Sequence, residues 1–156
     1  SIFYGSSIKK GTVSLKYYIT GTRRGLGKIL KDSLNSVSTM EECDVFINCK
    51  YDGFNQVELL YDATELGKRV INIGSNVSNM SYNKRSRYQI HKAALDKANT
   101  QLFYAGHNTT NVKFGYFDSP NVSDVQAEKM SLQYCRDVIL WILEQPYRIK
   151  SITVTP

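Results

Sequence analysis

The sequence has little of what a metal site or a disulfide framework requires. Its three cysteines, Cys43, Cys49 and Cys135, are odd in number and scattered, and the chain has only two histidines. Structural metal sites need clustered Cys or His ligands, and disulfide frameworks need paired cysteines. We therefore expect reduced cysteines with mostly structural roles and no bound metal.

Long apolar runs are also missing. No stretch approaches the roughly 20 apolar residues that a membrane-spanning helix needs. The first ten residues show no apolar stretch behind a basic start, which a secretory signal would have. We expect a soluble, cytoplasmic protein without membrane contacts.

Basic residues exceed acidic ones, giving a formal net charge of +6, but no sustained basic tract exists. The clusters at 9–10, 23–24 and 84–87 are short, and no nucleic-acid-binding module accompanies them. We therefore expect no nucleic-acid partner. A solvated basic surface explains most of the charge, except where a cluster lies inside a phosphate-binding loop.

Strand-like and helix-like stretches alternate along the 156 residues, a length that suits one domain. Apolar or β-branched runs favour five strands, at 16–20, 43–49, 69–75, 111–117 and 147–154. Helical spacing of apolar residues occurs at 26–34, 56–66, 88–105 and 127–143. This alternation predicts an α/β protein, a three-layer sandwich around a parallel sheet.

A glycine-rich turn joins the first strand to the first helix. Gly21, Gly25 and Gly27 would let the backbone approach a pyrophosphate, while the helix start attracts the anion. Arg23 and Arg24 lie inside the turn, where an anion would relieve their mutual repulsion. Alternatively, the turn is a tight connection without a ligand and both arginines face solvent.

Two further features suggest acid/base chemistry. Ser75 ends the third predicted strand, at the sheet edge where ligands of such folds bind. Tyr88 and Lys92 are four residues apart and share one face of a helix, so the ammonium can stabilise a phenolate. The alternatives are a serine that caps the next turn and an ordinary surface pair.

In combination, these motifs resemble those of the short-chain dehydrogenases/reductases. The family's Thr-Gly-x-x-x-Gly-x-Gly is present as residues 20–27, and its Tyr-x-x-x-Lys as Tyr88 to Lys92. The family's serine, expected thirteen residues before the tyrosine, is Ser75. The resemblance runs from about Lys16 to the carboxyl end and implies a single NAD(P)-binding Rossmann-like domain over residues 1–156.

The resemblance implies an enzyme that interconverts a carbonyl and an alcohol on a small-molecule substrate by hydride transfer. Tyr88 would be the acid/base, Lys92 would hold the nicotinamide ribose and lower the pKa of the tyrosine, and Ser75 would orient the substrate oxygen. Residues 77–87 would line the substrate pocket. The basic residues at 84–87 would either favour an anionic substrate or remain solvated.

The resemblance also implies the cofactor contacts. The glycine motif contributes Gly21, Thr22, Arg23, Arg24, Gly25, Leu26 and Gly27. Asn48 and Cys49 would lie beside the adenine-side ribose, although the family's Asn-Asn-Ala-Gly is here Asn-Cys-Lys-Tyr. Val122 would hold the carboxamide through its backbone. Asn55 is the nearest candidate for the family's catalytic asparagine, with a spacing that is short.

The chain is shorter than the family pattern on its adenine side. Only residues 35–43 separate the first helix from the next strand, too few for the second and third strands of the usual order. We therefore expect a reduced sheet of about five strands, with the first strand at an edge. Residues 1–15 precede the usual family start, and we expect them to cover this edge in the same subunit or in a partner.

Cofactor preference follows from the same shortening. The acidic residue that binds the ribose of NAD, about 20 residues beyond the glycine motif, has no strand to follow here. A basic residue at Arg24 is typical of members that bind NADP, because it can pair with the 2′-phosphate. We expect NADP(H) to be preferred over NAD(H).

Two alternatives remain open at this point. The family's usual homodimer or homotetramer would use the helix that carries Tyr88 and the apolar "VILWIL" at 138–143, although core burial explains this run equally well. The fold could also serve a non-catalytic dinucleotide sensor or scaffold. Retention of Ser75, Tyr88 and Lys92 together favours the enzyme, and nucleic-acid binding ranks third.

Overall fold

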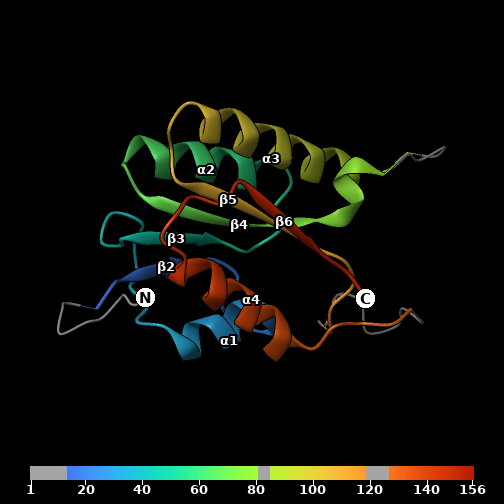
Figure 1. Ribbon diagram of the computed structural model, residues 1–156, viewed down its shortest axis with the longest axis horizontal. Helices are drawn as coiled ribbons and strands as arrows, with labels where there is room; N and C mark the ends of the chain where they lie inside the picture. Colours follow the sequence, from blue (N-terminus) through green and yellow to red (C-terminus); the bar gives the residue numbers. More distant parts are fainter. Residues whose placement is uncertain (1–13, 81–84, 119–126) are drawn as a thin grey trace.

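The computed structural model describes residues 14–80, 85–118 and 127–156, and in them five parallel strands form one sheet (Figure 1). The strands are β2 (Tyr17–Ile19), β3 (Val45–Asn48), β4 (Arg69–Ser75), β5 (Thr109–Phe114) and β6 (Ser151–Val154). Four of them lie within the predicted stretches, and β5 overlaps its predicted stretch but begins at Thr109, two residues earlier. The predicted parallel α/β class is therefore confirmed.

The order of the strands in the sheet is the order in the chain, β2-β3-β4-β5-β6. Ile19 pairs with Ile47, and Ile47 with Ile71, so the strands run in register toward one carboxyl edge. Between β2 and β3 the described chain holds a helix but no further strand. The expected shortening is confirmed, and β2 is the edge strand of the described sheet. Residues 1–13, most of the predicted cover for this edge, lie outside the described residues.

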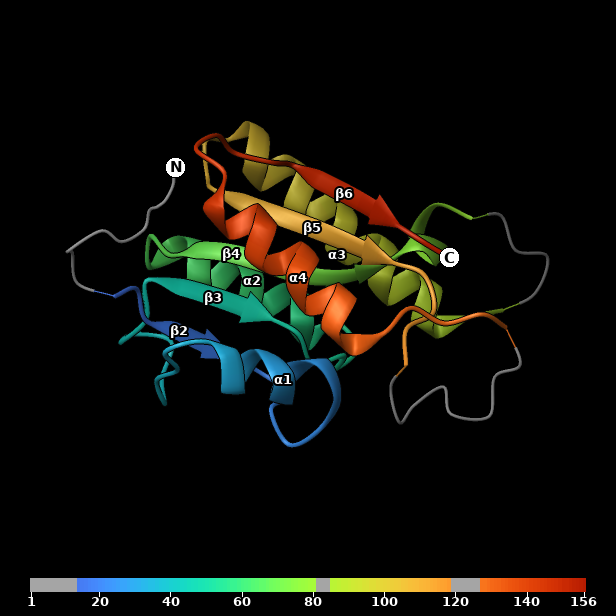
Figure 2. The ribbon, with the colours of Figure 1, turned by 60° about the horizontal axis from the view of Figure 1, so that its bottom comes forward.

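Helices cover both faces of the sheet (Figures 1 and 2). One layer holds α1 (Gly25–Ser33) and α4 (Leu132–Glu144), and the other holds α2 (Asn55–Glu65) and α3 (Arg87–Tyr104). A short 3-10 helix, η1 (Asn76–Asn79), follows β4 directly. The sheet is thus buried on both faces, which explains why its strands are nearly continuous apolar runs.

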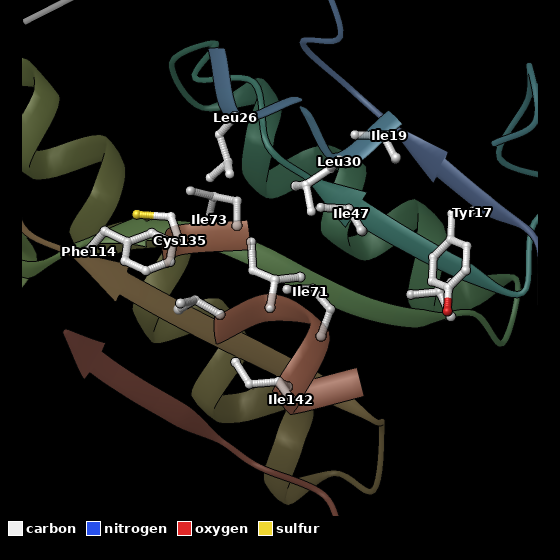
Figure 3. Close-up of a cluster of buried hydrophobic side chains, with 13 residues drawn as sticks. Tyr17, Ile19, Leu26, Leu30, Ile47, Ile71, Ile73, Phe114, Cys135 and Ile142 are labelled. Atoms are coloured by element: carbon white, nitrogen blue, oxygen red, sulfur yellow. The ribbon is translucent and has the colours of Figure 1, made fainter. Parts of the chain in front are cut away.

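Two hydrophobic clusters fill the space between the layers. Under α1 and α4 the cluster includes Leu30, Ile47 and Ile71, all fully buried (Figure 3). Under α2 and α3 the second cluster includes Phe46 and Leu95. Neighbouring residues of β3 therefore point to opposite clusters, as the two-residue period of a strand requires. Each such side chain contributes roughly 1.5–3 kcal/mol by burial.

The helix that carries the predicted catalytic pair is fixed at both ends. Its N-cap Ser86 accepts a hydrogen bond at Oγ from the backbone N of Gln89 at 3.2 Å. At its other end, the Arg148 guanidinium donates to the carbonyl oxygens of Phe103 at 2.7 Å and His107 at 2.9 Å. These contacts satisfy backbone groups that the helix ends leave open and hold α3 in position against the sheet.

Candidate active site

The glycine turn at residues 20–27 has a backbone that other residues would disturb. Gly21 and Gly25 have positive φ angles of 71° and 67°, which side chains with a Cβ rarely adopt. A Cβ on Gly27 would lie 2.0 Å from the carbonyl oxygen of Gly21. The three glycines therefore bring the turn tightly against the start of α1.

This turn is attached to the end of the neighbouring strand. Thr20 Oγ1 accepts hydrogen bonds from the backbone N atoms of Cys49 at 3.0 Å and Lys50 at 3.1 Å. A Cβ on Gly21 would lie 3.2 Å from the Cβ of Lys50. The first residue of the motif thus aligns the turn with the segment after β3, the two places where the sequence predicted cofactor contacts.

The start of α1 is suited to an anion. Its N-cap, Arg24, makes no side-chain capping bond, and its first turn contains no acidic residue. The side chains of Arg23 and Arg24 are exposed beside it. Uncapped N–H groups and two guanidiniums together favour a phosphate, so these residues fit the anionic part of a dinucleotide.

A cavity of about 440 Å³ lies beside the turn, on the side of the edge strand. Its lining includes two ammonium groups, from Lys31 and Lys50. The hydroxyl-bearing residues Tyr18, Thr20, Thr22, Ser36 and Ser38 also line it, and among the described residues no Asp or Glu does. This composition fits a phosphorylated ribose better than a ribose whose two hydroxyls need an acceptor.

The three predicted catalytic residues occupy the carboxyl edge of the sheet. Ser75 ends β4, is 6% exposed, and accepts a hydrogen bond at Oγ from Val77 N at 3.3 Å. Tyr88 lies in the first turn of α3, and its side chain is 42% exposed. Lys92 follows one turn later and is 3% exposed, with Nζ 5.8 Å from the centre of the Tyr88 ring. The structure thus brings Tyr88 and Lys92 together as predicted.

Lys92 is held by neutral oxygen atoms. Its Nζ donates to the Gln56 Oε1 atom at 3.0 Å and to the carbonyl oxygen of Ile73 at 2.8 Å. Burial lowers the pKa of Lys92 to about 8, a fall that the nearby Cys49 partly opposes. Burial likewise raises the pKa of Cys49 to about 11, so this cysteine is a neutral thiol near pH 7.

Gln56, in the first turn of α2, is a site residue that the sequence did not reveal. It is 2% exposed, whereas Asn55, the sequence candidate for the family's asparagine, is exposed and bonds Asp52 at 3.0 Å. The available signal was periodicity, because Gln56 precedes the buried Leu60 by one helical turn. A polar residue on the apolar face of a helix needs a buried partner, and Lys92 is that partner.

The amide nitrogen of Asn48 bonds inside the protein, whereas its buried Oδ1 atom has no hydrogen-bond partner among the described residues. Asn48 is fully buried, and Nδ2 donates to Gln56 O at 2.8 Å and to the Asn72 Oδ1 atom at 2.9 Å. Asn72 in turn donates to the Asn99 Oδ1 atom at 3.1 Å and to Thr109 Oγ1 at 3.3 Å. A chain of buried amides therefore leads from the Lys92 region along the sheet, and the Asn48 side chain supports the site from within.

Tyr51 adds a second phenol beside Tyr88 and Lys92, the predicted catalytic pair. Its ring centre lies 4.9 Å from that of Tyr88 in an edge-on arrangement and 5.6 Å from Lys92 Nζ. The Tyr51 hydroxyl forms a 2.7 Å hydrogen bond with His91 Nδ1, and the His91 ring packs edge-on against Phe54. The segment after β3 is thereby attached to α3. The sequence indicated this residue only as a departure from the family's glycine.

The segment after Ser75 is also attached to α3. Gln89 Nε2 donates to the carbonyl oxygens of Val77, at 3.0 Å, and Met80. This places η1 beside Tyr88, where the substrate pocket was predicted, and Arg85 and Arg87 are exposed nearby. Val122 and Lys84 lie outside the described residues.

Two negative findings bear on the class of site. Among the described residues, no group of three or more His, Cys, Asp and Glu side chains is placed to hold a metal ion. Within the same ranges, no helix has the length and apolar character needed to cross a membrane.

The sheet, the two helical layers and the glycine turn define a Rossmann-like α/β fold. No protein-family model and no curated protein sequence matches this chain. Many solved structures do match it. A short-chain dehydrogenase from Burkholderia cenocepacia J2315 in complex with NADP superposes with a TM-score of 0.72 at 14% identity, covering 90% of this chain and 88% of that one.

Other matches share the same architecture. A 4-hydroxyisoleucine dehydrogenase mutant complexed with NADH and succinate gives a TM-score of 0.71 at 12% identity, with 90% and 96% of the two chains covered. An alcohol dehydrogenase from the archaeon Thermococcus sibiricus complexed with 5-hydroxy-NADP gives 0.70 at 11% identity, with 90% and 95% covered. The chain therefore has the fold of the short-chain dehydrogenases/reductases, as its motifs predicted.

Proposed function

We propose that the protein is an NADP-dependent oxidoreductase of the short-chain dehydrogenase/reductase family, which interconverts a carbonyl and an alcohol. The observation that carries this proposal is the buried Lys92 ammonium beside the Tyr88 ring, at the same sheet edge as the glycine turn. Burying a lysine ammonium without a carboxylate partner costs free energy, so a lysine buried in this way is a candidate functional residue. The complexes with NADP and NADH among the structural matches support the same reaction class.

Different residues of the chain would bind different parts of the dinucleotide. The glycine turn, the N–H groups at the start of α1 and the guanidiniums of Arg23 and Arg24 would hold the pyrophosphate. Lys92 would hold the nicotinamide ribose, Cys49 would lie beside the adenine-side ribose, and Val122 would contact the carboxamide. When bound, the nicotinamide supplies or accepts the hydride.

Tyr88 is the proposed acid/base. During reduction its hydroxyl donates a proton to the carbonyl oxygen of the substrate, and during oxidation the phenolate takes the alcohol proton. The charge of the buried Lys92 ammonium, whose Nζ lies 5.8 Å from the centre of the Tyr88 ring, would stabilise the phenolate. Ser75 Oγ accepts from Val77 N, which orients its hydroxyl while its own hydrogen can still be donated to the substrate oxygen.

We expect NADP(H) to bind more tightly than NAD(H), because the described residues that line the cavity beside the turn include Lys31 and Lys50 but no carboxylate. Arg24, exposed in the same turn as the cavity-lining Gly21 and Thr22, adds a third cation. In titrations followed by nicotinamide fluorescence, NADPH should show the lower Kd. Arg24→Ala should raise this Kd about 10-fold or more, the equivalent of one charge-assisted hydrogen bond. Lys97→Ala removes an equal charge from an exposed site on α3 and should leave the Kd unchanged.

The catalytic assignment needs a separate experiment. A panel of aldehydes and ketones is screened with NADPH, and the best substrate is then assayed with Tyr88→Phe. The variant should bind NADPH normally but lose at least 100-fold in kcat, the usual contribution of a positioned proton donor. Normal turnover by Tyr88→Phe would refute the acid/base role.

A non-catalytic dinucleotide sensor is the second candidate, favoured by one observation. Tyr51 occupies the position of the family's glycine and packs against Tyr88 and Lys92. Under this alternative, well-folded protein binds NADPH, but no carbonyl compound in the panel is reduced. Tyr51→Gly then separates the two possibilities. If the protein is an enzyme, the variant should keep its turnover, because glycine is the family's residue at this position. If it is a sensor, the variant should gain no turnover.

A further inference from the structure

We infer that Gln56 is the positioning residue of the site, which fixes Lys92 in place and determines the direction of its remaining hydrogen bond. Its consequence for catalysis rests on the proposed function. Its structural content does not, because the contacts between Gln56, Lys92 and the backbone exist in the protein by itself.

The orientation of the Gln56 amide is determined by its surroundings. Its Nε2 atom donates to the carbonyl oxygens of Asn48 at 2.9 Å and Ile73 at 3.2 Å. Rotating the amide by 180° would place its oxygen against these two acceptors and its NH₂ group against the Lys92 ammonium. Both contacts would be repulsive, so the Oε1 atom must face Lys92 Nζ, as observed at 3.0 Å.

The hydrogen-bond count of Lys92 gives Gln56 its importance. An ammonium has three N–H donors. Gln56 and the Ile73 carbonyl oxygen accept two of them, and both acceptors are buried within the protein. Among the described residues no third acceptor lies within hydrogen-bond distance of Nζ, and the Tyr51 and Tyr88 rings lie 5.6 and 5.8 Å from it. Gln56 thereby leaves a single N–H to point toward the proposed ribose.

The neutrality of Gln56 matters as much as its geometry. The titratable groups that face Lys92 are Cys49 after β3, Tyr51 in the following segment and Tyr88 on α3. Among the described residues, no carboxylate forms an ion pair with Lys92. The amide therefore solvates the ammonium without neutralising its charge, which remains available to a phenolate.

The inference is tested by the pKa of Lys92, measured by NMR on protein labelled with ¹³C at lysine Cε, with the signal assigned from Lys92→Arg. A carboxylate in Gln56→Glu should raise this pKa by roughly 1 to 3, as an opposite charge in contact does. Gln56→Met, similar in size but without an acceptor, should lower it below its present value of about 8. The two variants thus move the same group in opposite directions.

Asn55→Asp provides the matched control. It introduces the same charge one residue earlier on α2, on an exposed side chain that bonds Asp52. The pKa of Lys92 should stay unchanged in this variant. An equal response to Asn55→Asp and Gln56→Glu, or no response to either Gln56 variant, would overturn the inference. Near-UV circular dichroism checks the fold, and either Gln56 variant alone decides the question if the other unfolds.

Failure of this inference is distinguishable from failure of the proposed function. If the pKa of Lys92 shifts as expected in the Gln56 variants but no dinucleotide binds, Gln56 still positions Lys92 and the oxidoreductase proposal is refuted. If carbonyl compounds are reduced but the pKa of Lys92 is unchanged in both Gln56 variants, the oxidoreductase proposal is supported and the positioning role of Gln56 is refuted. With both proposals correct, the alkaline limit of kcat moves upward in Gln56→Glu, because Lys92 keeps its charge to higher pH.

Discussion

A lysine ammonium with 3% exposure depends on protein atoms for the solvation that water gives elsewhere. Lys92 receives it from two neutral oxygens and has no ion-pair partner among the described residues. Such an arrangement stabilises the fold less than an apolar side chain of similar volume would. This free-energy cost of burying Lys92 is consistent with a functional role for its charge.

This cost predicts how the stability of the fold changes with pH. The pKa of Lys92 is about 8 in the folded protein and 10.5 in the unfolded chain, a difference equivalent to about 3 kcal/mol. Between these values the unfolded chain binds more protons, so the free energy of unfolding rises with pH across this window. Below pH 8 both states are protonated and the full cost of burying the charge remains.

Urea unfolding of the wild type and Lys92→Met at pH 7.5 and pH 10 measures this effect. Relative to the variant, the wild type should gain about 2 kcal/mol over this interval. The contributions of other titrating groups to the unfolding free energy largely cancel when the variant is subtracted from the wild type. A parallel pH dependence of the two proteins would mean that Lys92 titrates in the folded state as it does in the unfolded chain.

The residues that the sequence revealed and those it missed differ in a physical respect. Ser75, Tyr88 and Lys92 belong to patterns of fixed spacing, so local periodicity brings the last two to one helical face. Gln56 and Tyr51 reach the site only because separate elements pack together, with Gln56 contacting Lys92 from 36 positions away. Such contacts leave no local pattern in a single sequence.

At the scale of the elements, the glycine turn is the segment in which a small change has the largest consequence. Gly27→Ala should gain about 1 kcal/mol in helix propensity, but the added Cβ would lie 2.0 Å from Gly21 O, a backbone atom. Such overpacking costs about 3 kcal/mol. The net result should be a loss of about 2 kcal/mol in unfolding free energy, together with loss of NADPH binding.

Gly67→Ala separates this clash from a general effect of replacing glycine. Gly67 has a φ of 73° but no atom within 4 Å of an added Cβ, so only conformational strain of about 1 kcal/mol is expected. NADPH binding should persist in this variant. If Gly27→Ala also bound NADPH with unchanged affinity, the tight approach of the turn to α1 would be irrelevant to the ligand.

The elements themselves were largely predictable, and their ends were not. All five strands were found because burial on both faces produces apolar runs. The last strand was predicted from residue 147 but begins at Ser151. Residues 147–150 instead approach the end of α3, where Arg148 binds carbonyl oxygens and Lys150 O accepts from Asn99. Ile149 O and Lys150 O also accept from Thr110 Oγ1 and Asn111 N of β5, although regular strand pairing begins only at Ser151. Intrinsic strand propensity does not reveal such tertiary contacts.

At the scale of the whole molecule, the apolar "VILWIL" run serves the core and the surface together. Ile139 and Ile142 are fully buried, whereas Trp141 is 52% exposed and Tyr134, two helical turns earlier, is 50% exposed. We propose that this face of α4 contributes to a homodimer or homotetramer. Light scattering after gel filtration should give the mass of an oligomer for the wild type and a smaller mass for Trp141→Lys. Tyr147, which is 83% exposed, provides the control, because Tyr147→Lys should leave the mass unchanged.

We expect the proposed dinucleotide to stabilise the shortened sheet. β2 lies at the edge of the described sheet, and the turn that follows it is held to β3 by the Thr20 contacts. A dinucleotide across this edge would bind only the folded state and stabilise it by RT ln(1 + [L]/Kd), about 2.7 kcal/mol at 100 times Kd. For a domain of this size the expected rise in Tm is about 5–10 °C.

Thermal unfolding with NADPH and NADH at equal concentration tests the complete proposal in one series. NADPH should raise Tm more than NADH in the wild type, because only NADPH places a phosphate near Lys31, Lys50 and Arg24. Tyr88→Phe should keep the full rise, since the phenol serves chemistry rather than binding. Gly27→Ala should lose the rise, because the turn no longer admits the pyrophosphate. Equal shifts with the two cofactors would leave the lysine-lined cavity without a role in cofactor choice, and no shift with either would exclude dinucleotide binding.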